Sequence, residues 1–124
     1  MNKDVIASDN KALISINNNA TEVKQTMLEK KAQYDFAMNQ LGIFKMAKYK
    51  AYSKFESMKR NFNTNSSEYL AAKSQLSSVL SQNFEAELNT DILRSSYQDS
   101  IFYNGKVATC AIIANYKLGW FINS

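Results

Sequence analysis

The chain has 124 residues, of which 45% are hydrophobic and 12% aromatic, and this composition argues against wholesale disorder. It carries a net charge of +4 and contains no histidine, no proline, three glycines and one cysteine. The lack of histidine removes the usual general base and the commonest metal ligand, and one cysteine excludes an intramolecular disulfide and a cysteine-rich zinc site. With so few helix breakers, we expect one all-α domain.

The first segment, residues 1–18, is polar and rich in asparagine and serine. We expect it to form a flexible or short-helical N-terminal arm. It has no basic region followed by an apolar run, so no cleavable secretory signal is expected. Its amphipathic, Ser/Asn/Ile-rich composition resembles the export signals of type III secretion substrates. The expected location is therefore the cytoplasm, or outside it by a signal-less export route.

A long amphipathic helix is predicted over residues 19–62, where Asn19 and Glu22 have the spacing of a capping box. Its apolar positions follow alternating steps of four and three, with Lys30 and Lys48 as interruptions. We call this row the α-seam; its members are Val23, Met27, Tyr34, Ala37, Leu41, Phe44, Ala51, Phe55, Met58 and Phe62. A repeat averaging 3.5 residues keeps one stripe facing a partner. A helix of about 65 Å requires such a partner because it is too long for a compact domain.

The partner is predicted to be the next helix of the same chain. Residues 63–67 form a polar turn, and Asn65 with Glu68 repeats the capping signal before a helix over residues 68–103. The seam of this helix consists of Tyr69, Ala72, Leu76, Val79, Asn83 and Ala86. A short polar connection favours an antiparallel, coiled-coil-like helical hairpin. Residues 89–91 could cap a further helix, so this segment is either one bent helix or two.

The predicted domain spans residues 19–124. Its C-terminal part follows residues 104–105, where the preceding helix is expected to stop. This Asn-Gly pair either ends a helix or forms the turn of a β-hairpin over residues 101–109. Beyond it we expect an additional apolar helix over residues 106–122. The longest uncharged apolar run, residues 107–116, is too short to cross a bilayer core of about 20 residues.

The second helix carries another apolar row, which is offset by roughly 80–120° from its seam at about 100° per residue. A helix with two apolar rows has two neighbours. We call the second row the outer stripe; it consists of Leu80, Phe84, Leu88 and Ile92. Leu118, Trp120 and Phe121 add apolar side chains near the C-terminus. These seven residues are the candidate interface, which either closes the chain's own core or contacts another molecule.

Positive charge is concentrated in the first half of the chain. Residues 1–62 carry eleven basic and six acidic residues, whereas residues 63–124 carry four and five. The candidate polyanion-binding residues are Lys45, Lys48, Lys59 and Arg60, with aromatic residues interleaved among them. The alternative is internal neutralisation, because in an antiparallel hairpin Lys48 would meet Asn83, and Lys45 would approach Glu85 and Glu87.

No catalytic, cofactor-binding or metal-binding pattern accompanies these features, so an enzyme is not expected. The leading hypothesis is a non-enzymatic structural or interaction protein, a helical subunit that assembles with itself or with a helical partner. A filament or a secretion apparatus contains subunits of this kind. The alternatives are a nucleic-acid-binding protein that uses residues 45–60, and a membrane-active protein that docks on a membrane surface through residues 106–122.

Overall fold

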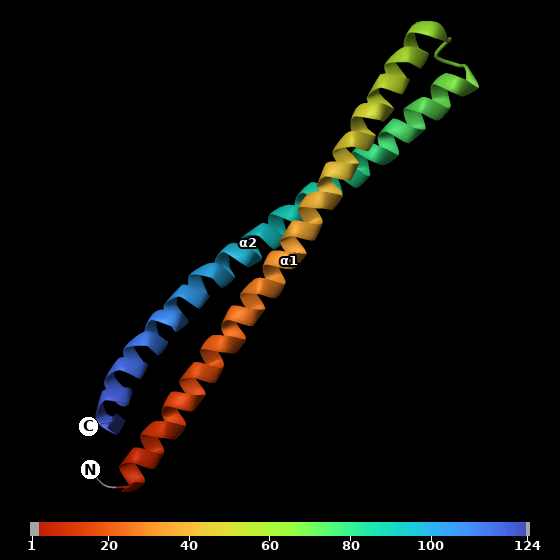
Figure 1. The fold of residues 1–124 in the computed structure, drawn as a ribbon. Helices are drawn as coiled ribbons and strands as arrows, with labels where there is room; N and C mark the ends of the chain where they lie inside the picture. Colours follow the sequence, from red (N-terminus) through yellow and green to blue (C-terminus); the bar gives the residue numbers. More distant parts are fainter. Residues whose placement is uncertain (1–2, 124) are drawn as a thin grey trace. The chain divides into compact units, whose positions relative to one another are not determined.

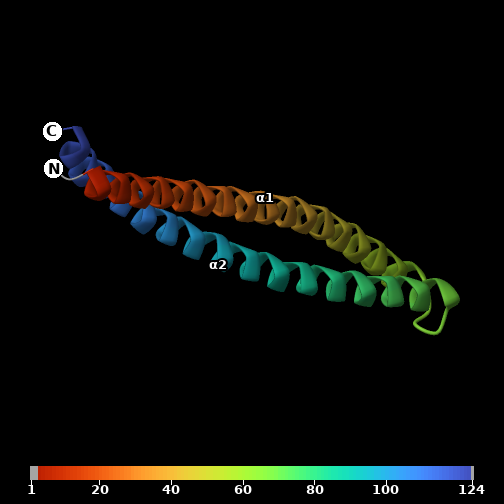
Figure 2. The same cartoon turned by 90° about the horizontal axis from the view of Figure 1, so that it is seen from below.

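The computed structural model describes the backbone of residues 3–123 and the side chains of residues 3–120. It contains two α-helices, α1 (Lys3–Asn61) and α2 (Ser67–Asn123), and no strand within the described residues. The helices run in opposite directions and pack against each other as a hairpin (Figures 1 and 2). The predicted all-α class and helical hairpin are therefore confirmed.

The chain divides into two compact units. The turn unit is Gln33–Arg94, and the terminal unit combines Met1–Ala32 with Ser95–Ser124. Each unit contains one stretch of α1 and one stretch of α2, so each has its own helix–helix contact. The outer stripe and the basic residues 45–60 belong to the turn unit.

The N-terminal residues differ from the expected arm, because α1 begins at Lys3 and not at Asn19. The reason is that the α-seam extends backwards through residues 3–18 in the same steps of three and four. The half-buried positions of this extension are Ile6, Asp9, Leu13, Ile16 and Ala20. Asn19 and Glu22, the expected capping box, lie in the middle of the helix. Continued burial along one face overrides a capping signal worth about 1 kcal/mol.

Of the two alternatives left open for residues 89–91, a second helix start is wrong, because α2 continues through them. Thr90 is the reason: it occupies the next seam position after Asn83 and Ala86 and is only 1% exposed. Its hydroxyl donates a hydrogen bond to the carbonyl oxygen of Ala86 at 2.7 Å, within the helix. A threonine that bonds its hydroxyl backwards in this way does not need to act as a helix cap.

The stop expected at residues 104–105 is also wrong, and residues 106–122 are not a separate helix. Neither the helix end nor the β-hairpin over residues 101–109 forms, since α2 extends without interruption to Asn123. The seam repeat continues through this region at Ser100, Asn104, Val107, Ala111, Ala114 and Leu118. No glycine of the described residues has a positive φ, so Gly105 is an ordinary helical residue. Packing on α1 outweighs the cost of about 1 kcal/mol for a helical glycine.

The connection between the helices is residues 62–66, one residue earlier than the expected turn at residues 63–67. The amide of Tyr69 donates a hydrogen bond to the Oγ atom of Ser66 at 3.2 Å, which makes Ser66 the N-cap of α2. The expected cap, Asn65, instead donates its backbone N–H to the Oδ1 atom of Asn63 at 3.0 Å. The side chain of Asn63 thus shapes the turn, and Ser66 starts the helix.

The core of the hairpin is made largely of small side chains. The buried apolar residues are Ala37, Leu41, Ala51, Ala72, Leu76 and Ala111. Alanine at the contact lets two helices approach closely, but it removes little apolar surface from water. Many large apolar side chains therefore remain exposed on both units, and this exposure defines the candidate site.

Candidate interaction surface

The outer stripe lies on the solvent side of α2 in the turn unit. Its residues follow one another every four positions, while the seam residues Leu76, Asn83 and Thr90 turn towards α1. The exposed fractions of the stripe are 37% for Leu80, 59% for Phe84, 49% for Leu88 and 67% for Ile92. The expected second neighbour of this helix is not a part of the turn unit.

A groove adjoins the outer stripe where α2 meets α1. It is lined by Phe55 of α1 and by Lys73, Leu76, Ser77, Leu80, Ser81 and Phe84 of α2. Phe55 also packs on Tyr69, with a distance of 5.4 Å between the ring centroids. The two serines leave space between larger apolar side chains, so the groove can receive one apolar side chain from another molecule.

Large apolar side chains are also exposed around α1 of the turn unit. Exposed apolar side chains of α1 on this unit are Phe36, Met38, Ile43, Met46, Tyr49 and Tyr52. Phe36 and Phe44 line another groove with Gln82, Glu85 and Asn89 of α2. On its α2 side, this groove is more polar than the groove beside Leu80.

The C-terminal candidate residues belong to the terminal unit and not to the turn unit. Leu118 is half-buried at the seam, and Trp120 is exposed. The side chain of Phe121 lies outside the described residues. Nearby, Ile101, Phe102 and Cys110 line an open groove, and Cys110 is an exposed free cysteine. Docking of residues 106–122 on a membrane surface remains a prediction, and no helix within the described residues has enough length and hydrophobicity to cross a membrane.

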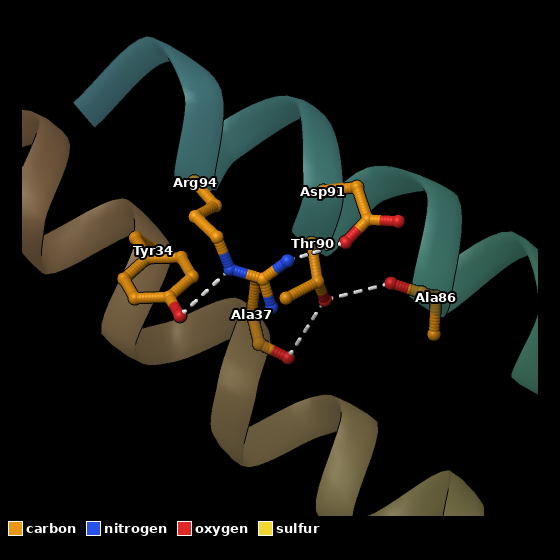
Figure 3. Close-up of polar contacts among 6 residues, drawn as sticks. All are labelled: Tyr34, Ala37, Ala86, Thr90, Asp91 and Arg94. Carbon is orange, nitrogen blue, oxygen red and sulfur yellow. Dashed lines mark hydrogen bonds and ion pairs between the residues drawn. The ribbon is translucent and has the colours of Figure 1, made fainter. Parts of the chain in front are cut away.

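A polar cluster joins the two helices of the turn unit (Figure 3). The Nε atom of Arg94 donates a hydrogen bond to the Oη atom of Tyr34 at 3.2 Å, and its Nη1 atom lies 2.6 Å from the Oδ1 atom of Asp91. The guanidinium carbon lies 5.6 Å from the centroid of the Tyr34 ring. The hydrogen bond and the charge interaction with Tyr34, followed by the hydrogen bond and the charge of Asp91, raise the pKa of Arg94 above its ordinary value.

The same close-up shows the Thr90 hydroxyl between Ala86 and Ala37 (Figure 3). Its Oγ1 atom lies 2.7 Å from the oxygen of Ala86 and 3.5 Å from the oxygen of Ala37 on α1. A hydroxyl has one proton to donate, so the shorter contact is the hydrogen bond. The longer distance shows how closely the two backbones approach at this point. This cluster was not predicted from the sequence, although the seam repeat places residue 90 after residues 83 and 86.

Polar contacts also cross between the helices of the terminal unit. The side-chain amides of Asn17 and Asn115 exchange hydrogen bonds of 3.2 and 2.7 Å. The Nζ atom of Lys30 donates to the Oγ atom of Ser96 at 2.6 Å. These contacts explain how Lys30, the first charged interruption of the α-seam, is accommodated.

The four candidate polyanion-binding residues are not neutralised internally by carboxylates as the alternative predicted. Lys45, Lys59 and Arg60 are exposed, and Lys48 is half-buried. Within residues 3–120, none of these four side chains forms an ion pair with a carboxylate. Lys45 therefore does not pair with Glu85 or Glu87, and these cations remain available to another molecule.

Asn83 is a buried polar residue in the seam, with an exposed fraction of 5%. Its Nδ2 atom donates to the Oε1 atom of Glu87 at 3.0 Å, but its Oδ1 atom has no hydrogen-bond partner. Lys48, which was expected to meet Asn83, therefore forms no hydrogen bond with the Oδ1 atom of Asn83. The reason is helix register: a register in which Lys48 faces Asn83 would place Phe62 opposite Tyr69, whereas Phe55 is the residue whose ring contacts Tyr69.

The search for a metal centre gives a negative result within the described part of the chain. Among the described residues, no group of three or more His, Cys, Asp or Glu side chains is placed to hold a metal ion. Comparison of the chain with protein-family models, with curated proteins and with solved structures finds no match in any of the three. The exposed apolar surface of the turn unit is therefore the principal clue to function.

Proposed function

We propose that this protein is a non-enzymatic interaction subunit, which assembles with itself or with a helical partner through the outer stripe of α2. The observation that carries the proposal is the exposure of all four stripe residues, which recur every fourth position along a single helix face. Scattered exposed apolar residues are ordinary, but a continuous row of them on one face is typical of a binding site.

The proposal is tested first on the purified chain, by light scattering over a series of protein concentrations. We expect a mass above that of the monomer, and we expect the double variant Leu80→Asp/Leu88→Asp to remain monomeric because each aspartate would be buried unpaired. The matched control is Ser74→Asp/Ser78→Asp, which adds the same charge at exposed positions of α2. Circular dichroism should show unchanged helix content in both variants.

A second arm covers a partner other than the chain itself. A photo-crosslinking amino acid is placed at position 84 or, as the control, at position 78, in the cells that naturally produce the protein. Crosslinks from position 84 that are missing from position 78 support an interaction surface. A monomer at every concentration, together with no crosslinks specific to position 84, would contradict the proposal.

A second candidate function is the binding of nucleic acid through Lys45, Lys48, Lys59 and Arg60. It is favoured by the lack of carboxylate partners for these cations and by the exposed rings of Tyr49 and Tyr52 beside them, on which bases could stack.

Fluorescence polarisation with a random single-stranded oligonucleotide tests this candidate. If it holds, affinity falls steeply as salt rises, and Lys45→Glu/Lys59→Glu weakens binding more than the control Lys11→Glu/Lys24→Glu, which changes net charge equally. Absence of binding at about 50 mM salt would exclude nucleic acid as the partner, since electrostatic binding is strong at that ionic strength.

A further inference from the structure

We infer that the terminal unit docks on a membrane surface that contains anionic lipids, through the side of α2 that points away from α1. This side belongs to a different unit from the outer stripe, so the inference does not depend on the proposed function. Three observations carry it: the position of the exposed apolar side chains, their chemical types and the sign of the charges beside them.

Exposed apolar side chains of the terminal unit gather on one side of α2. The buried and half-buried seam positions of this stretch are Ser100, Asn104, Val107, Ala111, Ala114 and Leu118. At about 100° per residue, five large apolar residues lie within about 60° of the direction opposite this seam. We call them the outward face; they are Phe102, Ile112, Ile113, Tyr116 and Trp120, with exposed fractions between 48% and 77%. The solvent side of a surface helix is normally polar, so the outward face indicates contact with another phase or molecule.

The chemical types of these side chains favour a lipid interface. Tyr116 and Trp120 each combine an apolar ring with a polar tip, and such side chains are enriched where lipid headgroups meet acyl chains. Ile112 and Ile113 have no polar atom and would enter the apolar layer. The outward face extends along about 27 Å of one uninterrupted helix, which can lie flat in the plane of a membrane surface.

The charges beside the outward face are all positive. Residues 100–120 contain Lys106 and Lys117 and no acidic residue. Both lysines lie on the same flank, about 60–80° from the centre of the outward face at about 100° per residue. Within residues 3–120, neither lysine forms an ion pair with a carboxylate. An apolar face flanked by cations alone is complementary to anionic lipids, whose headgroups attract the cations while the acyl region receives the apolar side chains.

Lys106 already combines both properties within one side chain. Its Nζ atom lies over the ring of Phe102, 4.5 Å from the centroid, so its stem follows the apolar surface. The two residues line an open groove that includes Gly105, where an added methyl group would meet no other atom within 4 Å. Nothing on this side therefore blocks the lysine. On a bilayer its flexible stem can extend, so that the ammonium reaches a lipid phosphate while the Phe102 ring enters the apolar layer.

Flotation of the full chain with lipid vesicles tests the inference. We expect the chain to float with phosphatidylcholine vesicles that contain about one third phosphatidylserine, and much less with pure phosphatidylcholine, because the lysines favour an anionic surface. Trp120 is the only tryptophan of the chain and gives a second readout. Its fluorescence emission should shift to shorter wavelength when the anionic vesicles are added, since its ring leaves water.

Two pairs of variants separate the apolar and the charged contributions. Ile112→Gln/Tyr116→Gln should weaken vesicle binding about tenfold or more, because it removes apolar burial without changing the charge. Its matched control is Ile14→Gln/Leu28→Gln, which replaces exposed apolar residues of α1 in the same unit.

Lys106→Gln/Lys117→Gln should weaken binding to the anionic vesicles about thirtyfold and leave the weak binding to pure phosphatidylcholine unchanged. Lys11→Gln/Lys24→Gln, which removes the same charge from α1, should have a smaller effect. Circular dichroism should show unchanged helix content in all four variants, since every position is exposed.

The outcomes also separate this inference from the proposed function. Absence of flotation with anionic vesicles at low salt, or equal losses in the outward-face variants and their controls, would overturn the inference. It would also be overturned if Ile112→Gln/Tyr116→Gln abolished assembly in light scattering while the wild-type chain bound no vesicles, because the outward face would then be a protein interface. Leu80→Asp/Leu88→Asp should still float with anionic vesicles, so assembly through the outer stripe can fail while membrane docking stands, and the reverse.

Discussion

At the scale of single residues, two buried polar side chains have different consequences. The Thr90 hydroxyl bonds to the Ala86 carbonyl, so its burial carries no unsatisfied group. The Asn83 Oδ1 atom is buried without a partner. An unsatisfied buried acceptor lowers the free energy of unfolding by about 1–3 kcal/mol. We therefore expect such a residue in the core to have a compensating role. In helical pairs, that role is often the selection of one register.

We therefore expect Asn83→Leu to increase the free energy of unfolding by about 1 kcal/mol or more, because it removes the unsatisfied acceptor and adds apolar burial. Urea unfolding measures the change. The control is Asn89→Leu, which makes the same substitution at an exposed position of α2 and should have little effect. A lower stability of Asn83→Leu would mean that the Oδ1 atom has a partner in solution.

The helix cap gives a second prediction at this scale. Ser66→Ala should lower the free energy of unfolding by about 1 kcal/mol, because the amide of Tyr69 loses its acceptor. Asn65→Ala, at the position that the sequence pattern favours as the cap, should change stability much less. Thermal unfolding compares the two variants, and a reversed order would place the start of α2 one residue earlier.

At the scale of elements, the continuity of both helices is the main finding. Gly42 and Gly105 lie in helix interiors, and a methyl group built on either residue meets no other atom within 4 Å. Neither glycine is thus required for close packing. Both are tolerated because the seam on the opposite face supplies the packing energy, and they leave the helices less stable than they could be.

Gly105→Ala should therefore raise the free energy of unfolding by about 1 kcal/mol, and Gly42→Ala should have a similar effect, since both glycines are helical and unobstructed. The sign of the first change is diagnostic. If Gly105 ended a helix in a left-handed conformation, alanine would destabilise the protein instead. Chemical denaturation of the single variants, beside the wild-type protein, decides between these signs.

At the scale of the whole molecule, large apolar side chains and the four candidate polyanion-binding residues are both left without internal partners of the expected kind: the apolar side chains are exposed, and the cations have no carboxylate partner. Four of the six buried apolar residues are alanines, so the chain gains only part of the burial that its apolar content permits. Association would complete that burial. Stability and assembly are then linked by mass action, because a partner that binds only the folded state stabilises that state.

This linkage predicts that the melting temperature of the wild-type protein rises with protein concentration. The melting temperature of Leu80→Asp/Leu88→Asp should be independent of concentration, because the variant is monomeric. Scanning calorimetry over a concentration series provides the measurement, with Ser74→Asp/Ser78→Asp as the control. Concentration-independent melting of the wild-type protein, within the range where light scattering finds assembly, would contradict the linkage.

The sequence by itself determined the helical hairpin. Alternating steps of three and four, a polar connection after Phe62 and the lack of proline were sufficient. The second apolar row at Leu80 predicted a second neighbour for α2 without identifying it, and the structure shows this row exposed within the turn unit. These signals repeat over many residues, so their energies add along each helix. The extent of the hairpin could have been found in the same way, had the repeat been followed through Leu13 and Val107.

The tertiary structure alone decided where local signals are overruled. Asn19, Asn89 and Asn104 each begin a sequence that favours a helix boundary, yet all three lie inside continuous helices. Only the boundary at Ser66 is used. A cap or a turn is worth about 1 kcal/mol, whereas a buried leucine or valine side chain contributes about 1.5–3 kcal/mol. Burial against the opposite helix therefore decides which boundaries form, and it depends on contacts between residues far apart in the sequence.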